Sequence, residues 1–67
     1  MIKNYQHNII HQLSETLDSL WRMDQYLEDA RKEGYQEGID FWNEYRESLE
    51  KQIEILKEEL KKTAKNL

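Results

Sequence analysis

Apolar residues between positions 42 and 60 recur at alternating steps of three and four. The row consists of Trp42, Leu49, Ile53, Leu56 and Leu60, and Arg46 stands at its one polar position. This spacing places the side chains along one narrow stripe of a helix. The residues between them are nearly all polar or charged, so the opposite face is predicted to contact water. One helix cannot bury its own stripe, and the segment therefore requires another helix.

A second stripe with the same spacing lies earlier in the chain. It consists of Ile10, Leu13, Leu17, Leu20 and Leu27, with Asp24 in the gap. The pattern predicts an amphipathic helix over about residues 4–33. Proline is absent and glycine occurs only twice, so little else interrupts helical structure. The sequence therefore predicts an all-α chain.

The two glycines lie close together and mark the one candidate break. Arg31 and Lys32 precede Gly34, which is typical of a helix C-terminus that ends in a left-handed glycine. We predict a single helical hairpin spanning residues 1–67, with a turn at about 34–38 and a second helix at about 39–64 that Asp40 could cap. Tyr35 and Ile39 already follow the apolar phase of that helix, so a start as early as Tyr35 is the alternative. The alternative is one continuous long coiled-coil helix, because two glycines inside a helix cost only about 1 kcal/mol each.

An antiparallel hairpin brings the two stripes together in one particular register. The predicted pairs are Leu13 with Leu60, Leu17 with Leu56, Leu20 with Ile53, and Asp24 with Leu49. The polar positions Asp24 and Arg46 then lie about one turn apart on facing helices. We predict an ion pair between them inside the apolar stripe, where it would specify register more than stability.

The length of the chain favours self-association. A chain of 67 residues without cysteine has no disulfide, and a single core of this size seldom supplies more than about 3–5 kcal/mol. We therefore expect a homo-oligomer, most simply a homodimer that forms a four-helix bundle. The predicted oligomer interface comprises both stripes: Ile10, Leu13, Leu17, Leu20, Leu27, Trp42, Leu49, Ile53, Leu56 and Leu60.

Charge argues against several classes of partner. Charged residues make up 36% of the chain and the net charge is −4, but acids and bases alternate without a basic face, so no nucleic acid partner is expected. No apolar run approaches the roughly 20 residues of a membrane span or the length of a signal peptide. These features predict a cytoplasmic protein without a membrane partner.

Candidate catalytic and metal-binding residues are few. His7, His11 and Glu15 share one helical stripe, and imidazoles four residues apart can bind a divalent transition metal. Histidines near a helix end are more often solvated, so a metal- or ligand-binding bundle is kept as an alternative and no cofactor is expected. The chain has no cysteine nucleophile and no glycine-rich phosphate loop. We do not expect an enzyme.

Aromatic residues gather beside the predicted turn. Tyr35, Phe41, Trp42 and Tyr45 either close the base of the hairpin or form an exposed patch for an unidentified protein partner, because such rings often anchor interfaces. The function predicted from the sequence is a small non-enzymatic protein–protein interaction module, acting as a regulator, inhibitor or adaptor. A structural coiled-coil rod is a further alternative.

Overall fold

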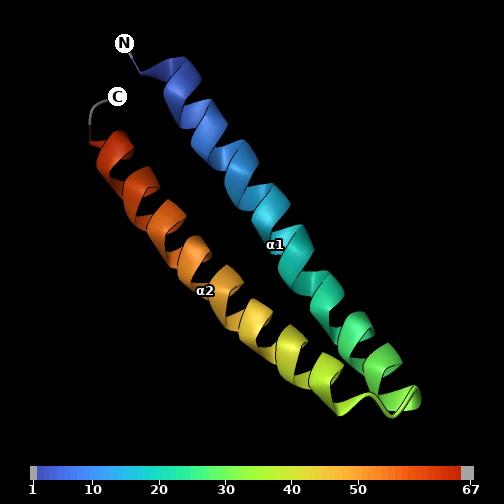
Figure 1. Ribbon diagram of the computed structural model, residues 1–67. Coiled ribbons are helices and arrows are strands. Elements are labelled where there is room, and N and C mark those ends of the chain that lie inside the picture. The colour runs from blue at the N-terminus through green and yellow to red at the C-terminus, as the bar shows by residue number, and fades with distance from the viewer. Residues whose placement is uncertain (1, 66–67) are drawn as a thin grey trace.

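The computed structural model describes residues 2–65, which form two helices, α1 (Lys3–Lys32) and α2 (Gln36–Ala64). The helices run antiparallel and side by side, so both chain ends lie at the same end of the molecule (Figure 1). The molecule measures 51 × 14 × 10 Å. The predicted all-α hairpin is confirmed, and the alternative of one continuous helix is wrong because the chain reverses direction at Gly34.

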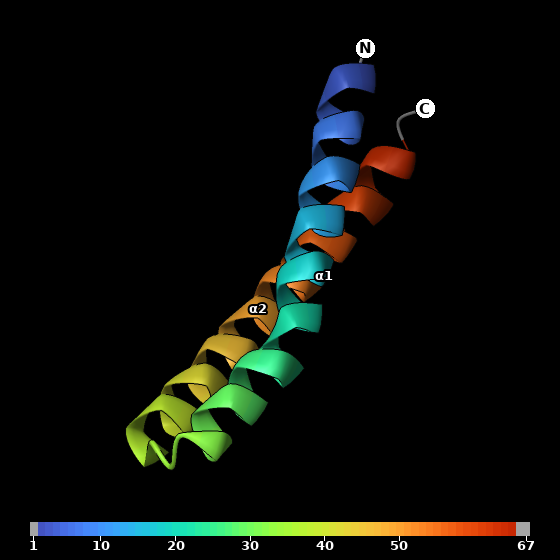
Figure 2. The same ribbon diagram turned by 90° about the vertical axis from the view of Figure 1, so that its right-hand side faces the viewer.

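The contact between the helices is a single seam, which we define as the buried and half-buried positions spaced three and four apart. At the N-cap of α1 and along that helix these are Ile2, Gln6, Ile9, Leu13, Thr16, Leu20, Met23, Leu27 and Ala30, and in α2 they are Ile39, Trp42, Arg46, Leu49, Ile53, Leu56, Leu60 and Thr63. A mean spacing of 3.5 residues makes two helices coil around each other. Accordingly, the helices exchange sides along their length in Figure 2.

The seam of α1 differs from the predicted stripe. Leu13, Leu20 and Leu27 lie in it, but Ile10 and Leu17 are exposed. Thr16 and Met23 take the intervening positions and are buried. Burial of Thr16 is inexpensive because its hydroxyl donates a hydrogen bond to the backbone oxygen of Gln12 at 2.8 Å.

The register between the helices also differs from the predicted one. Leu17 is 46% exposed and the Asp24 side chain is 77% exposed, so neither packs against the buried residues of α2 as the predicted pairs require. At the open end, Gln6 Nε2 donates a hydrogen bond to Thr63 Oγ1 at 3.3 Å. The predicted pairing is therefore wrong, because it assumed that Leu17 and Asp24 belong to the seam.

The turn is built by two hydrogen bonds that end α1. The amide of Gly34 donates to the Arg31 oxygen, and the amide of Tyr35 donates to the Ala30 oxygen, both at 3.0 Å. This pair of bonds is the Schellman motif, and Gly34 takes its left-handed position with φ of 67°. Gly34 thus has the predicted role.

The second helix begins near the earlier of its two predicted starts. α2 starts at Gln36 rather than near residue 39, and Tyr35 is its N-cap residue. The Tyr35 carbonyl oxygen accepts hydrogen bonds from the amides of Gly38 and Ile39, both at 3.1 Å. Asp40 is therefore not the cap; its carboxylate accepts a hydrogen bond from Gln36 Nε2 at 2.9 Å.

We predict that Gly34→Ala lowers the free energy of unfolding by about 1–2 kcal/mol, because a Cβ in the left-handed region clashes with the following carbonyl oxygen. Denaturant unfolding followed by circular dichroism measures the loss. Gly34→Asn is the matched control and should lose less, since asparagine tolerates this conformation. Equal stability of wild type and Gly34→Ala would show that the turn does not require glycine.

Candidate functional site

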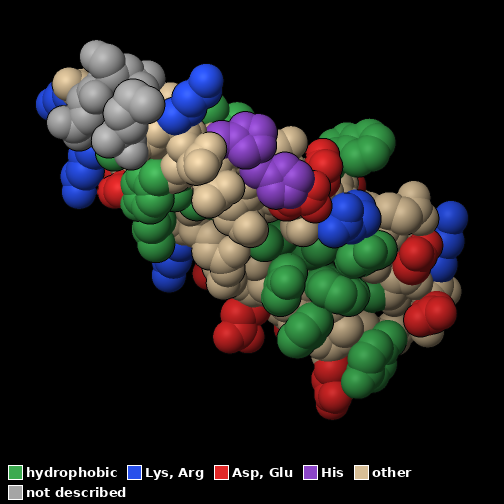
Figure 3. All heavy atoms as spheres, turned by 90° about the horizontal axis from the view of Figure 1, so that it is seen from above, with side chains coloured by type: hydrophobic (Ala, Val, Ile, Leu, Met, Phe, Trp, Pro, Cys, Tyr) green, Lys and Arg blue, Asp and Glu red, His purple; other side chains and the backbone are tan. Residues whose placement is uncertain are grey.

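Four aromatic rings meet near the turn and join the two helices. Tyr26 of α1 packs on Trp42 of α2 with ring centroids 4.9 Å apart. Phe41 lies edge-on to Trp42, also at 4.9 Å, and Tyr45 lies edge-on to Trp42 at 5.8 Å. Trp42 is therefore the centre of the cluster. Hydrophobic side chains gather on this half of the molecule in the space-filling view (Figure 3).

The rings differ in how much of their surface is covered. Trp42 belongs to the seam and is half-buried, whereas Phe41 and Tyr45 remain 54% and 44% exposed. Trp42 can therefore be assigned a packing role between the helices. Phe41 and Tyr45 add little to the seam and present apolar ring surface to solvent.

Tyr35 stands at the tip of the hairpin, where the turn places it. A Cβ built on Gly38 would lie 2.6 Å from Tyr35 Cδ2 and 3.6 Å from Ala30 Cβ. The ring thus lies directly over Gly38, an approach that any larger residue at position 38 would block. The Tyr35 hydroxyl donates a hydrogen bond to Glu37 Oε2 at 3.3 Å.

An open groove runs between these rings, and we call it the turn groove. Its apolar lining comes from Tyr26, Ala30, Tyr35, Gly38, Phe41 and Trp42. Three carboxylates, those of Asp29, Glu33 and Glu37, complete the lining. Among residues 2–65, no lysine or arginine belongs to the lining. The groove therefore combines aromatic faces with negative charge.

The structure brings together most of the patch predicted from the sequence. Phe41, Trp42 and Tyr45 contact one another, while Tyr35 shares the turn groove with Phe41 and Trp42. The acids of the groove were not predicted as part of it. Glu33 and Glu37 flank the turn in sequence, but Asp29 reaches the groove only because α1 adopts the phase that buries Met23 and Ala30.

A second exposed apolar surface follows one side of α1, and we call it the α1 flank. It consists of Ile10, Leu17 and Trp21, whose exposed fractions are 49%, 46% and 80%. Separations of seven and four residues keep these side chains on one side of the helix. The other eight residues of the predicted oligomer interface lie in the seam within one chain. Of that predicted interface, Ile10 and Leu17 are thus left uncovered, and Trp21, which was not predicted as part of it, joins them on the α1 flank.

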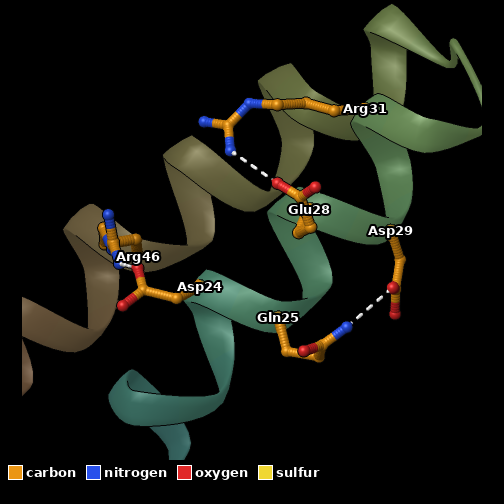
Figure 4. A network of polar contacts seen from close by, with 6 residues as sticks. All are labelled: Asp24, Gln25, Glu28, Asp29, Arg31 and Arg46. Atoms are coloured by element: carbon orange, nitrogen blue, oxygen red, sulfur yellow. Dashed lines mark hydrogen bonds and ion pairs between the residues drawn. The ribbon is translucent and has the colours of Figure 1, made fainter.

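The predicted pair of Asp24 and Arg46 forms, with Arg46 in the seam and Asp24 outside it. Arg46 Nη2 contacts Asp24 Oδ1 across the two helices (Figure 4). The Asp24 side chain is 77% exposed and that of Arg46 is 34% exposed, so the expected burial of the pair is wrong. Nearby, Arg31 pairs with Glu28 at 3.7 Å and Gln25 Nε2 donates to Asp29 Oδ1 at 2.8 Å. The role of the pair in setting register stays a prediction.

The histidine stripe remains on the surface. Figure 3 shows the two histidine side chains next to each other. His11 Nε2 lies 3.9 Å from Glu15 Oε1, and both side chains are more than half exposed. Across residues 2–65, no group of three or more His, Asp or Glu side chains is arranged to hold a metal ion. His7, His11 and Glu15 therefore gain no support as a metal site from their geometry.

At the open end of the hairpin, Tyr5 reaches from α1 to α2. Its hydroxyl donates a short hydrogen bond to Glu59 Oε2, which raises the pKa of Tyr5 above 10.0 because ionisation would break that bond and place two negative charges together. Tyr5, Ile9, Ile55 and Leu56 also line a groove at this end. Sequence reasoning did not identify this contact, because the pair is 54 residues apart and depends on register.

We predict that the Asp24–Arg46 pair contributes only about 0.2–1 kcal/mol, because the carboxylate is largely exposed to water. A double-mutant cycle with Asp24→Asn and Arg46→Gln, measured by denaturant unfolding, gives the coupling energy. The coupling should fall as salt is added. A cycle with Asp18→Asn in place of Asp24→Asn is the control and should show no coupling. A coupling several times larger would mean that the pair acts as a buried one.

We also predict that Tyr5 ionises above pH 10.0 in the folded chain. Because folding raises this pKa, the hydrogen bond adds stability below the ordinary pKa of tyrosine, and that stability is lost as the pH rises through the folded value. The difference between the alkaline ultraviolet titrations of wild type and Tyr5→Phe isolates Tyr5. Glu59→Gln should return its pKa toward 10.0; an unchanged midpoint would show that Glu59 is not the cause.

Comparison with known proteins adds no family to these observations. No family model matches the chain, and no curated protein or solved structure matches it. Within residues 2–65, neither helix has the length and apolar character that crossing a membrane requires.

Proposed function

We propose that the chain is a non-enzymatic protein–protein interaction module that works as a homo-oligomeric helical bundle, most simply a homodimer of hairpins. In this role it serves as a small regulator, inhibitor or adaptor. The single observation that carries the proposal is the α1 flank, because Ile10, Leu17 and Trp21 are large apolar side chains with no covering element.

The amount of buried surface supports the same proposal. Within residues 2–65 the buried apolar residues number five: Met23, Leu27, Ala30, Leu49 and Ile53. Full burial of a large aliphatic side chain contributes about 1.5–3 kcal/mol, which must offset a backbone entropy of about 1–2 kcal/mol for every ordered residue. Two helices that share one narrow seam bury little apolar surface relative to the backbone entropy that they lose. A second hairpin packed on the α1 flank would bury more apolar surface.

The position of the α1 flank also suits a four-helix bundle. Ile10 and Leu17 are seven residues apart and follow the same heptad spacing as the seam beside them. Leu13 and Leu20 of the seam are only half-buried and lie next to them on α1. A second copy packed there would therefore extend the existing seam sideways, as neighbouring helices do in a bundle.

We predict that Leu17→Glu shifts the chain from dimer to monomer and raises the dissociation constant at least tenfold, about 1.4 kcal/mol, because the carboxylate would lose its water in the interface. Sedimentation equilibrium or light scattering across a concentration series measures the mass.

The matched control is Ile55→Glu. Ile55 is 69% exposed on α2 and lies outside the α1 flank, so this variant should keep the mass of the wild type. A wild-type chain that sediments as a folded monomer throughout the micromolar range would refute the proposal. Equal dissociation of both variants would show that the second copy does not use the α1 flank.

A further inference from the structure

The turn groove lies outside the surface proposed for self-association. Leu17 of the α1 flank and Tyr26 of the groove are nine residues apart, or about two and a half turns, so they lie on opposite sides of α1. A second hairpin on the α1 flank would therefore leave the groove open to solvent. The side chains that line the turn groove indicate which kind of ligand could bind there.

Aromatic faces supply the first half of the chemistry of this lining. Trp42 and Phe41 stand with an interplanar angle of 71°, and Tyr26 is tilted by 46° from Trp42. Rings at such angles present both faces and edges to the space between them. A cation over the face of Trp or Tyr is attracted by the ring quadrupole, and Trp gives the strongest attraction.

Carboxylates supply the second half. Asp29, Glu33 and Glu37 line the groove together, and no basic side chain lines it with them. Asp29 accepts only from the neutral amide of Gln25, and Glu37 only from the hydroxyl of Tyr35. Glu33 forms no side-chain hydrogen bond or ion pair within residues 2–65. Three acids beside aromatic rings therefore have no positive charge to balance them.

Lys32 adjoins Glu33 in sequence but does not line the turn groove, and the two arginines of α1 contact other residues. Arg31 Nη1 pairs with Glu28, on the side of α1 that carries Asp24 (Figure 4). Arg22 donates to Ser19 Oγ at 3.0 Å and lines an adjoining groove, which shares Tyr26, Phe41 and Trp42 with the turn groove. Among residues 2–65, no lysine or arginine lines the turn groove itself, so a cationic ligand would not have to displace one there.

We propose that the turn groove binds an arginine side chain of a partner protein. A guanidinium group fits because it stacks on aromatic rings and forms hydrogen bonds with carboxylates at the same time, which an ammonium group does less well. The groove holds about 580 Å³ and is open along its length, so the residues on either side of the arginine have room to pass. The inference rests on the proposed function, since it names the chemistry of a partner for the interaction module.

Nuclear magnetic resonance of the isotope-labelled chain tests the proposal with a blocked tripeptide of glycine, arginine and glycine. We expect saturable shifts of the Trp42 indole N–H and the Gly38 amide, with the Trp21 indole unchanged. The citrulline tripeptide has the same shape without the charge and should produce much smaller shifts. Shifts of equal size with citrulline would overturn the proposal, as would the absence of saturable shifts with arginine.

Two pairs of variants locate the site. Glu33→Gln combined with Glu37→Gln should lower the affinity for the arginine tripeptide by about fivefold or more, because it removes two charges that face the cation. Glu47→Gln combined with Glu50→Gln makes the same change in net charge outside the turn groove and should change the affinity less than twofold. Equal weakening by both double variants would mean that only the overall charge of the chain attracts the peptide, and the proposal would fail.

The aromatic contribution has its own test. Phe41→Leu keeps apolar bulk but removes a ring, so this variant should bind the arginine tripeptide severalfold more weakly. Trp21→Leu should leave the affinity for the tripeptide unchanged. Repeating the titration with Leu17→Glu separates this inference from the proposed function. Charge-selective shifts in that variant support the groove whatever its mass, and an unchanged mass refutes only the proposed dimer. A change of mass in the Glu33 and Glu37 double variant would assign the groove to self-association and overturn the inference.

Discussion

The alternating spacing of three and four residues along both helices is the constraint on which the rest of the structure depends. It limits contact between α1 and α2 to one seam, because only every third or fourth side chain points toward the partner helix. The seam contains polar members, yet no buried side-chain nitrogen or oxygen within residues 2–65 lacks a hydrogen-bond partner. Thr16 and Thr63 achieve this by donating to backbone oxygens of their own helices. A narrow seam can therefore tolerate polar residues where a wider core could not.

Two rows of residues compete for the seam of α1, and this explains what the sequence could and could not predict. Leu17 is more hydrophobic than Thr16, so a reading based on hydrophobicity favours the row through Leu17 and Asp24. The observed row instead places Met23 in the seam, which Asp24 would otherwise enter as a charge. In α2 only one row is apolar, and its members Trp42, Leu49 and Ile53 were predicted correctly. The fold was thus predictable from α2 and from Gly34, but the register depended on a choice in α1 that hydrophobicity alone decides wrongly.

The candidate site was also predictable only in part. Aromatic residues near the turn are visible in the sequence, because Phe41, Trp42 and Tyr45 are close neighbours. The arrangement of acids around them is not, since the side of α1 that carries Asp29 follows from the phase of the whole helix. Tyr35 illustrates a further limit. It ends the Schellman motif of α1 and also caps α2, and this double role allows a turn shorter than the spacing of the two glycines suggests.

A hairpin with a single seam necessarily has two flanks, and the two flanks of α1 differ in chemistry. The side with Ile10, Leu17 and Trp21 offers aliphatic and aromatic surface at heptad spacing, which suits another helix. The side with Tyr26 faces rings and carboxylates at the turn, which suits a cationic side chain. Because these surfaces lie about half a turn apart on one helix, occupation of one does not cover the other. A homodimer built on the first surface would then display two turn grooves, and a partner with two suitably spaced arginines would bind it more tightly than a single hairpin through effective concentration alone.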